Sequence, residues 1–249
     1  MAQPALKIDE LAESINSLAL KRRKPSPSEI ARLKNELGKS ITVRNAEYYD
    51  FLGRIACLEN DRARMITHYK EAITLSFRNN EIIQWNYFRS LENSGLFFKA
   101  REQLKVIAEK FSSHPRIREF EIQNSIDLCR FRETHQIINN AEFPLDKNYF
   151  LNSAISVFNK AELSDDEAEN LCKLAYSLLE IKNLYFSTAN WEVVDDCVFY
   201  TIYVDAPIEE MFDINWELAG VFVDNGKNRC NEVLAFKYSS IDVLEASKE

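Results

Sequence analysis

Two adjacent carboxylates are the residues of this sequence best placed to do chemistry. Asp195 and Asp196 stand side by side between two segments that we expect to be strands, and paired carboxylates can hold a divalent metal ion. A metal-dependent nuclease would also have an acidic residue and a lysine on an adjacent strand, and that pattern is missing. A turn carrying solvated carboxylates is the simpler interpretation. A metal-dependent enzyme site around Asp195, Asp196 and Glu232 is the alternative.

The other metal-ligating and nucleophilic residues form no recognisable set. The histidines have no Asp or Cys partner at ligand spacing, and they are His68, His114 and His135. The cysteines are odd in number, widely spaced and without a CxxC pair, and they are Cys57, Cys129, Cys172, Cys197 and Cys230. This usage favours reduced thiols in a cytoplasm. Phosphate-loop, dinucleotide, nucleophile-elbow and zincin motifs are absent, so we expect no catalytic residue, metal or cofactor.

A second acidic set lies near the C-terminus. Glu209, Asp213 and Glu217 are spaced by four residues, which places three carboxylates on one face of a helix. Such a row is either a solvated helix surface or an electronegative docking face for a basic partner protein. Both interpretations stay open at this point.

A pattern of large and small residues repeats along the first half of the chain. In residues 46 to 80, Tyr49, Gly53, Tyr69 and Ala72 have the spacing at which small residues let two antiparallel helices approach closely. The segment resembles a tetratricopeptide repeat. It departs from the family pattern at the turn, at a normally small position and at the usual terminal proline, where it has Asn60, Met65 and Phe77.

A shift of 35 residues gives a second unit, with Gly95 at the turn and Ala100 at the small position. A degenerate third unit has Ile122, Ile126, Ile138 and Ala141 near the expected offsets. The resemblance covers residues 46 to 143. It implies a stack of helical hairpins, an α-solenoid.

In this family the first helices of successive hairpins line a groove that receives peptides. The resemblance places seven residues of our site prediction there: Glu47, Asp50, Arg54, Ile82, Trp85, Asn86 and Arg89. Trp and Arg dominate binding energies at interfaces, although Trp85 could equally pack on its neighbours. Some members of the family bind the C-terminal carboxylate of a peptide with a set of Lys and Asn residues. That set is not reproduced here, since Asp50 and Arg54 occupy its positions in the first repeat.

Helices are also predicted on both sides of the repeats. Leu6 to Leu20 has helical periodicity, and Ser26 to Glu29 is a capping box with proline at the first helical position. Helices are also expected at 149 to 158 and, after a capping box at Ser164, to about Ile181. We therefore predict a mainly α protein with a tetratricopeptide-like domain over residues 1 to 182.

Residues 183 to 249 predict a small α+β domain. Strands are expected at 183 to 187, within 193 to 204 and at 233 to 238, with a helix that begins at Pro207. Their order is β-β-α-β. This domain could cap the solenoid or bind a partner by itself.

Composition narrows the function further. The net charge is −8 with the acidic residues spread along the chain, which argues against nucleic acid. No stretch approaches a membrane span and no signal sequence precedes the first helix. The sequence predicts a cytoplasmic, non-catalytic adaptor or regulator that binds a protein or peptide through the groove, the acidic domain or both. A basic partner is one option, because it would complement the acidic domain. An immunity-type or antitoxin-type inhibitor is the narrower interpretation.

Overall fold

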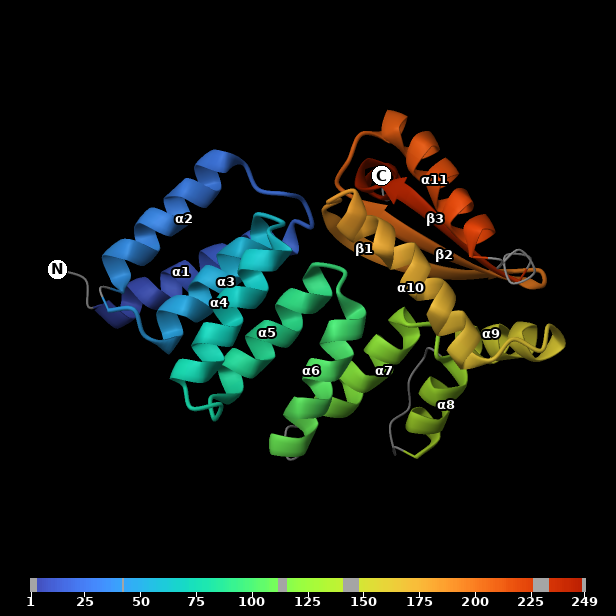
Figure 1. Cartoon of the computed structure of the whole chain (residues 1–249), viewed down its shortest axis with the longest axis horizontal. Coiled ribbons are helices and arrows are strands. Elements are labelled where there is room, and N and C mark those ends of the chain that lie inside the picture. The colour runs from blue at the N-terminus through green and yellow to red at the C-terminus, as the bar shows by residue number, and fades with distance from the viewer. Residues whose placement is uncertain (1–3, 42, 112–115, 141–147, 226–232, 248–249) are drawn as a thin grey trace. The chain divides into compact units, whose positions relative to one another are not determined.

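The computed structural model describes residues 4–41, 43–111, 116–140, 148–225 and 233–247 (Figure 1). It is mainly helical, with a small three-stranded mixed sheet near the C-terminus, as the sequence predicts. The chain divides into two compact units, Met1–Ser112 and Ser113–Glu249. The chain changes from helix to strand between Ile181 and Phe186, which is where the sequence places the domain boundary. The second compact unit begins earlier, at Ser113.

The described residues of the first unit form six helices in three consecutive hairpins. They are α1 (Pro4–Leu20), α2 (Pro27–Ser40), α3 (Ala46–Leu58), α4 (Arg62–Leu75), α5 (Glu81–Asn93) and α6 (Phe97–Lys110). Each pair of neighbours folds back at a short connection and packs together, and α3 also packs on α5 and α1 (Figure 1). The expected helical repeat arrangement over residues 46 to 110 is therefore present.

One small residue sets the distance between α3 and α4. A Cβ atom built on Gly53 would lie 2.7 Å from Cε2 of Tyr69, which is inside van der Waals contact. Tyr69 has no solvent-exposed surface, and its hydroxyl hydrogen-bonds to that of Ser90 on α5 at 2.8 Å. The predicted pairing of a small residue with a bulky one is thus seen in the packing.

Gly53→Ala is expected to lower the free energy of unfolding by about 1 to 2 kcal/mol, because overpacking outweighs the helix propensity gained from alanine. Gly38→Ala is the matched control, since a Cβ there meets no atom within 4 Å. That variant should be neutral or slightly stabilised. Urea denaturation of both variants checks this, and equal stabilities would mean that Tyr69 moves aside at little cost.

The repeated turns use left-handed backbone. Asn60 between α3 and α4 has φ of 62°, and Gly95 between α5 and α6 has φ of 71°. Both were predicted from their places in the repeat, because glycine and asparagine adopt this conformation most readily. Met65, the departure at a small position, is fully buried, so the hairpin accommodates the larger side chain.

The N-terminal hairpin closes the end of the first unit. Ser26 caps α2 through a reciprocal pair of bonds, in which the Ser26 amide donates to Glu29 Oε2 at 2.8 Å and the Glu29 amide donates to Ser26 Oγ at 3.3 Å. Buried leucines and isoleucines of α1 and α2 join one core with α3, among them Leu11, Ile15 and Leu33. This confirms the predicted helices and capping box.

The second unit combines helices with the sheet. Its helices are α7 (Ile117–Asp127), α8 (Phe131–Asn139), α9 (Asn148–Lys160), α10 (Asp165–Ile181), the 3-10 turn η1 (Ile208–Glu210), α11 (Met211–Asp224) and α12 (Ile241–Ala246). Its strands are β1 (Phe186–Val194), β2 (Cys197–Val204) and β3 (Leu234–Ser240). The third predicted hairpin is α7 and α8, and Ile122, Ile126 and Ile138 are buried in it; Ala141 lies outside the described residues.

The sheet has the predicted β-β-α-β order with shifted boundaries. β1 and β2 form an antiparallel hairpin, and β3 adds parallel to β2 after the α11 crossover. The first strand lies at 186 to 194 and not at 183 to 187, because the tight turn at Asp195 (φ 53°) leaves Val193 and Val194 to pair with β2. The α-helix begins at Met211, four residues after Pro207, and α12 was not predicted.

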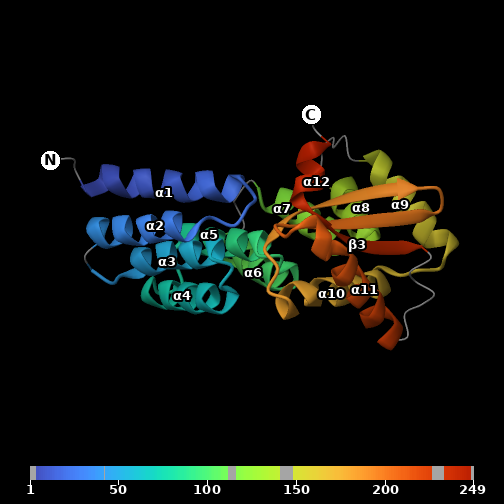
Figure 2. The same ribbon diagram turned by 90° about the horizontal axis from the view of Figure 1, so that it is seen from above.

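Aromatic side chains hold helices on one face of this sheet. Trp191 of β1 stacks on Tyr200 of β2, with ring centroids 3.5 Å apart, and Phe131 of α8 meets Trp191 edge-on at 5.4 Å. On the same face, the Tyr238 hydroxyl of β3 donates to the Ala175 carbonyl of α10 at 2.6 Å. α10 and α11 lie side by side on one side of the strands (Figure 2).

Candidate interaction sites

Two of the predicted groove residues join α3 to α5. Asn86 Nδ2 donates to both carboxylate oxygens of Asp50, at 3.1 Å to Oδ1 and 2.9 Å to Oδ2. Asp50 is only 5 % exposed. Its carboxylate therefore fixes the spacing of the two helices and is not presented to solvent.

A third groove residue faces α1. Arg54 Nη2 donates to Asn16 Oδ1 at 2.8 Å and to the Ala12 carbonyl at 3.4 Å, and its guanidinium lies 5.1 Å from the Phe51 ring centre. Arg54 thus links α3 to α1. Together with the Asp50–Asn86 pair, it gives the row α1, α3, α5 a continuous set of polar cross-links.

Burial changes the acidity of Asp50. Removal from water raises its pKa to about 7, while the positive charge of Arg54 and the Asn86 hydrogen bond act in the opposite direction. The negative charge of Glu47 adds a smaller rise. Asp50 therefore exchanges its proton close to neutral pH, inside the contact between two repeat helices.

The remaining groove residues lie on the outer part of the row. Ile82 is 70 % exposed. Arg89, seven residues after Ile82 on α5, and Glu47 on α3 are exposed as well. Trp85 is half-buried: its Nε1 donates to Glu81 Oε1 at 3.3 Å and its ring meets Phe88 edge-on at 5.7 Å. Trp85 therefore packs on its own helix and keeps part of its surface accessible.

The three predicted acidic residues of the second unit lie in η1 and α11. Glu209 lies in η1, Asp213 and Glu217 lie in α11, and all three are exposed. Glu217 Oε1 accepts from Lys182 Nζ at 2.5 Å, a pair with both side chains more than one-third exposed. Three carboxylates thus follow one side of the helix surface.

The alternative enzyme site lies at the β1–β2 turn, beside a hollow of about 470 Å³ that Asp195 and Asp196 help to line. Asp195 and Asp196 form the β1–β2 turn and are both exposed, and Asp196 pairs with Lys160 at 2.7 Å. Glu232 lies outside the described residues. Among the residues that the structure describes, no three His, Cys, Asp or Glu side chains come together as metal ligands. The metal-dependent alternative stays a prediction.

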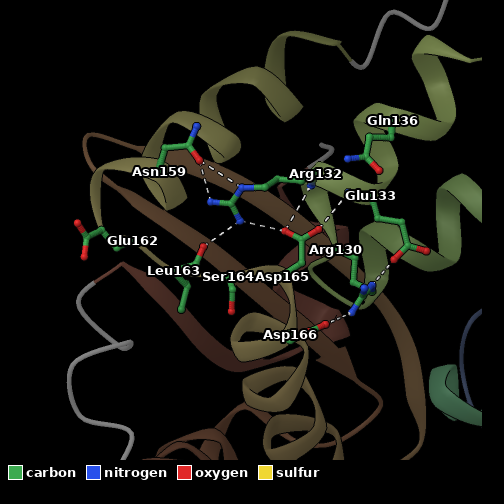
Figure 3. A pocket seen from close by; sticks show the side chains of 10 residues that line it. All are labelled: Arg130, Arg132, Glu133, Gln136, Asn159, Glu162, Leu163, Ser164, Asp165 and Asp166. Carbon is green, nitrogen blue, oxygen red and sulfur yellow. Dashed lines mark hydrogen bonds and ion pairs between the residues drawn. The ribbon is translucent and has the colours of Figure 1, made fainter.

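Sequence reasoning missed a polar pocket in the second unit. It is a hollow of about 690 Å³ lined by the start of α8, the end of α9 and the start of α10. Two arginines and several carboxylates line it (Figure 3). Arg132 Nη1 donates to Asp165 Oδ1 at 3.2 Å and to the Leu163 carbonyl at 2.9 Å. Asp165 Oδ2 in turn accepts from the Glu133 amide at 3.0 Å, so it caps α8 from a neighbouring helix.

Arg130 gathers three carboxylates beside this pocket. It pairs with Glu133, with Asp166 at 2.7 Å and with Glu169 at 2.5 Å. Burial opposes its charge, but the hydrogen bonds to these carboxylates raise the pKa of Arg130. Arg130 and Arg132 are thus both paired with carboxylates of this pocket. We call the ion pairs of Arg130 with Glu133, Asp166 and Glu169 the clasp, because they connect the start of α8 to α10. Only the capping pattern at Ser164 to Glu167 pointed to this region in the sequence.

Two cysteines that are 43 residues apart in sequence meet in the core of the second unit. The Sγ atoms of Cys129 and Cys172 are 2.6 Å apart, and both residues are fully buried free thiols. Burial raises the pKa of each thiol. No motif spacing marked this pair, because Cys129 lies in the turn between α7 and α8 whereas Cys172 lies in α10.

Comparisons with protein families, with characterised proteins and with solved structures found no match for this chain. None of the described helices has the length and apolar character needed to cross a bilayer.

Proposed function

We propose that this chain is a protein-binding module whose first unit recognises a partner protein through the outer face of α5 and the adjoining edge of α3. The helical hairpins resemble tetratricopeptide repeats in sequence, and the proposal takes from that family the use of first helices for binding. The role would be that of an adaptor or regulator, with no chemical step.

The observation that supports it most is the exposure of Ile82 beside Trp85 and Arg89. Ile82 is 70 % exposed, and the three residues fall at helical spacing on one face of α5. Tryptophan and arginine are among the residues that dominate interface energies, and the exposed Ile82 beside them adds apolar area that a partner can cover.

The cross-links below this face favour tight binding. The Asn86–Asp50 bonds fix α5 on α3, and Arg54 fixes α3 on α1. A partner would therefore meet a surface that is already ordered, so less conformational entropy is lost when the complex forms.

The test uses Ile82→Asp combined with Arg89→Glu, which leaves Trp85 and its packing intact. A protein that co-purifies with the full-length chain is identified by mass, purified and titrated against the variants. We expect its affinity for the double variant to fall at least tenfold, with helicity and melting temperature unchanged.

Leu75→Asp combined with Lys105→Glu is the matched control. It makes the same change of net charge on α4 and α6, at residues that are both exposed. Its affinity should equal that of the unaltered chain. Equal weakening by both double variants would show a general charge effect, and an unweakened Ile82/Arg89 variant would place binding elsewhere.

A further inference from the structure

The outward side of η1 and α11 carries a row of exposed apolar side chains. Ile208, Phe212, Trp216 and Val223 are 55 %, 75 %, 73 % and 59 % exposed. Their spacing of four, four and seven residues places them along one face. Ala219 and Gly220, both exposed, continue the row between Trp216 and Val223. We call these six residues the apolar stripe.

This stripe is separate from the face that α11 uses in the fold. Met211, Ile214, Leu218 and Phe222 are the buried residues of α11, and Phe222 packs against Phe236 of β3 with ring centroids 5.7 Å apart. α11 therefore has two apolar faces. The fold needs only one of them.

The size of the stripe distinguishes it from ordinary surface residues. It extends over about 22 Å of helix at 1.5 Å per residue, and the Phe212 and Trp216 rings lie nearly parallel with centroids 6.5 Å apart. Phe and Trp each remove about 150 to 250 Å² from water when covered. A contiguous exposed row of this kind is typical of an interaction surface.

The charge beside the stripe identifies what would cover it. Glu209, Asp213 and Glu217 follow the stripe along one edge, each one residue after a stripe residue, and all are exposed. Residues 208 to 225 contain no lysine or arginine, although Lys182 of α10 pairs with Glu217 at the end of this edge. A partner that covers the apolar side chains would bring its flanking residues against this acidic edge.

We propose that the outer face of α11 is a docking surface for a basic amphipathic helix of a partner protein. Apolar residues of that helix would cover Phe212 and Trp216, and its lysines or arginines would lie along Glu209, Asp213 and Glu217. The apolar face of the partner helix would pack along α11, as two helices pack side by side in a small interface. This surface belongs to the second unit and does not depend on the proposed role of α5.

A second copy of the chain fits the same surface less well. Two α11 helices packed antiparallel about a twofold axis would place both acidic edges on the same side, where they repel each other. In the parallel arrangement each acidic edge would face the edge with Asn215 and Ala219, which carries no positive charge. A net charge of −8 on each chain adds to the repulsion.

The test measures binding of a fluorescent peptide to the full-length chain by anisotropy. The peptide is a helix of about 18 residues with leucines spaced three and four apart and lysines elsewhere. One comparison peptide has the same composition in scrambled order, and another has glutamate in place of lysine. We expect the first peptide to bind at least tenfold more tightly than either comparison peptide.

Phe212→Ser combined with Trp216→Ser should weaken this binding at least tenfold, because it removes the two largest exposed rings of the stripe. Leu20→Ser combined with Phe77→Ser is the control, since it removes two side chains that are 81 % and 92 % exposed elsewhere. Its affinity should be unchanged. Glu209→Gln, Asp213→Asn and Glu217→Gln together should weaken binding at low salt and reduce its salt dependence.

Three results would overturn the proposal. The first is equal binding of the scrambled peptide, and the second is unaltered binding of the peptide by the Phe212/Trp216 variant. The third is a dimer in sedimentation that this variant converts to a monomer, because that result would assign the stripe to a second copy of the chain. The Ile82→Asp/Arg89→Glu variant should bind the peptide like the unaltered chain. Failure at α11 is thereby distinguished from failure of the α5 proposal.

Discussion

Asp50→Asn is expected to raise the free energy of unfolding at pH 8 by roughly 4 kcal/mol and to change it little at pH 4. The native pKa of Asp50 is about 7, against an ordinary value of 3.8. Between these pH values the folded protein holds a proton that the unfolded chain has released, so the stability of the unaltered protein falls as the pH rises. Asparagine cannot ionise, and its amide oxygen can still accept from Asn86. Chemical denaturation of both proteins between pH 4 and pH 8 measures the difference.

Glu47→Gln is the control for this pH dependence. Glu47 lies one helical turn before Asp50 on α3 but is exposed, so solvent screens its charge. Its substitution should change the shape of the stability curve only slightly, because its charge makes the smallest contribution to the raised pKa of Asp50. A loss of stability at pH 8 in the Asp50→Asn protein would mean that the charged carboxylate is favoured there, with Arg54 compensating for the cost of burial.

The helical hairpins could be predicted because their determinants are local. Gly53 and Tyr69 belong to the same hairpin, and the absence of a side chain on Gly53 leaves room for the large ring of Tyr69. Asn60 and Gly95 supply the left-handed turns that the repeat requires. Capping at Ser26 likewise involves residues three positions apart. Each of these features depends on neighbours along one hairpin, which a sequence pattern can represent.

The polar contacts between hairpins could not be predicted in the same way. Asp50 had been assigned to the groove surface, but its partner is 36 residues away and its carboxylate is buried. The same holds for Cys129 and Cys172. Helical spacing gives the face on which a side chain lies, whereas burial depends on which helix covers that face.

α11 shows the same limit on the apolar side. Its sequence has apolar residues on two faces, one with Ile214 and Leu218 and the other with Phe212 and Trp216. Periodicity alone cannot decide which face is buried, because both sets recur at helical spacing. In the structure the set with Ile214 and Leu218 is buried, whereas Phe212 and Trp216 remain exposed. The predicted row of carboxylates therefore borders an exposed apolar surface.

Arg130→Gln is expected to lower the free energy of unfolding by about 3 kcal/mol at pH 7, because Glu133, Asp166 and Glu169 would lose the cation that they share. The arginine side chain is 20 % exposed, and Glu133 and Glu169 are 30 % and 24 % exposed, so solvent compensates only part of the repulsion. The loss should shrink below pH 4, where the carboxylates gain protons in either protein. Urea denaturation at both pH values measures it.

Arg118→Gln separates this clasp from an ordinary surface ion pair. Arg118 pairs with Glu121 at 3.0 Å on α7, with a side chain that is 62 % exposed, and such pairs contribute little to stability. Arg130→Lys should recover only part of the loss, since a single ammonium group cannot reproduce the planar fork that reaches several carboxylates at once. If Arg130→Gln proves no more harmful than Arg118→Gln, the three carboxylates are solvated independently and α8 is held on α10 by Asp165 and by apolar packing instead.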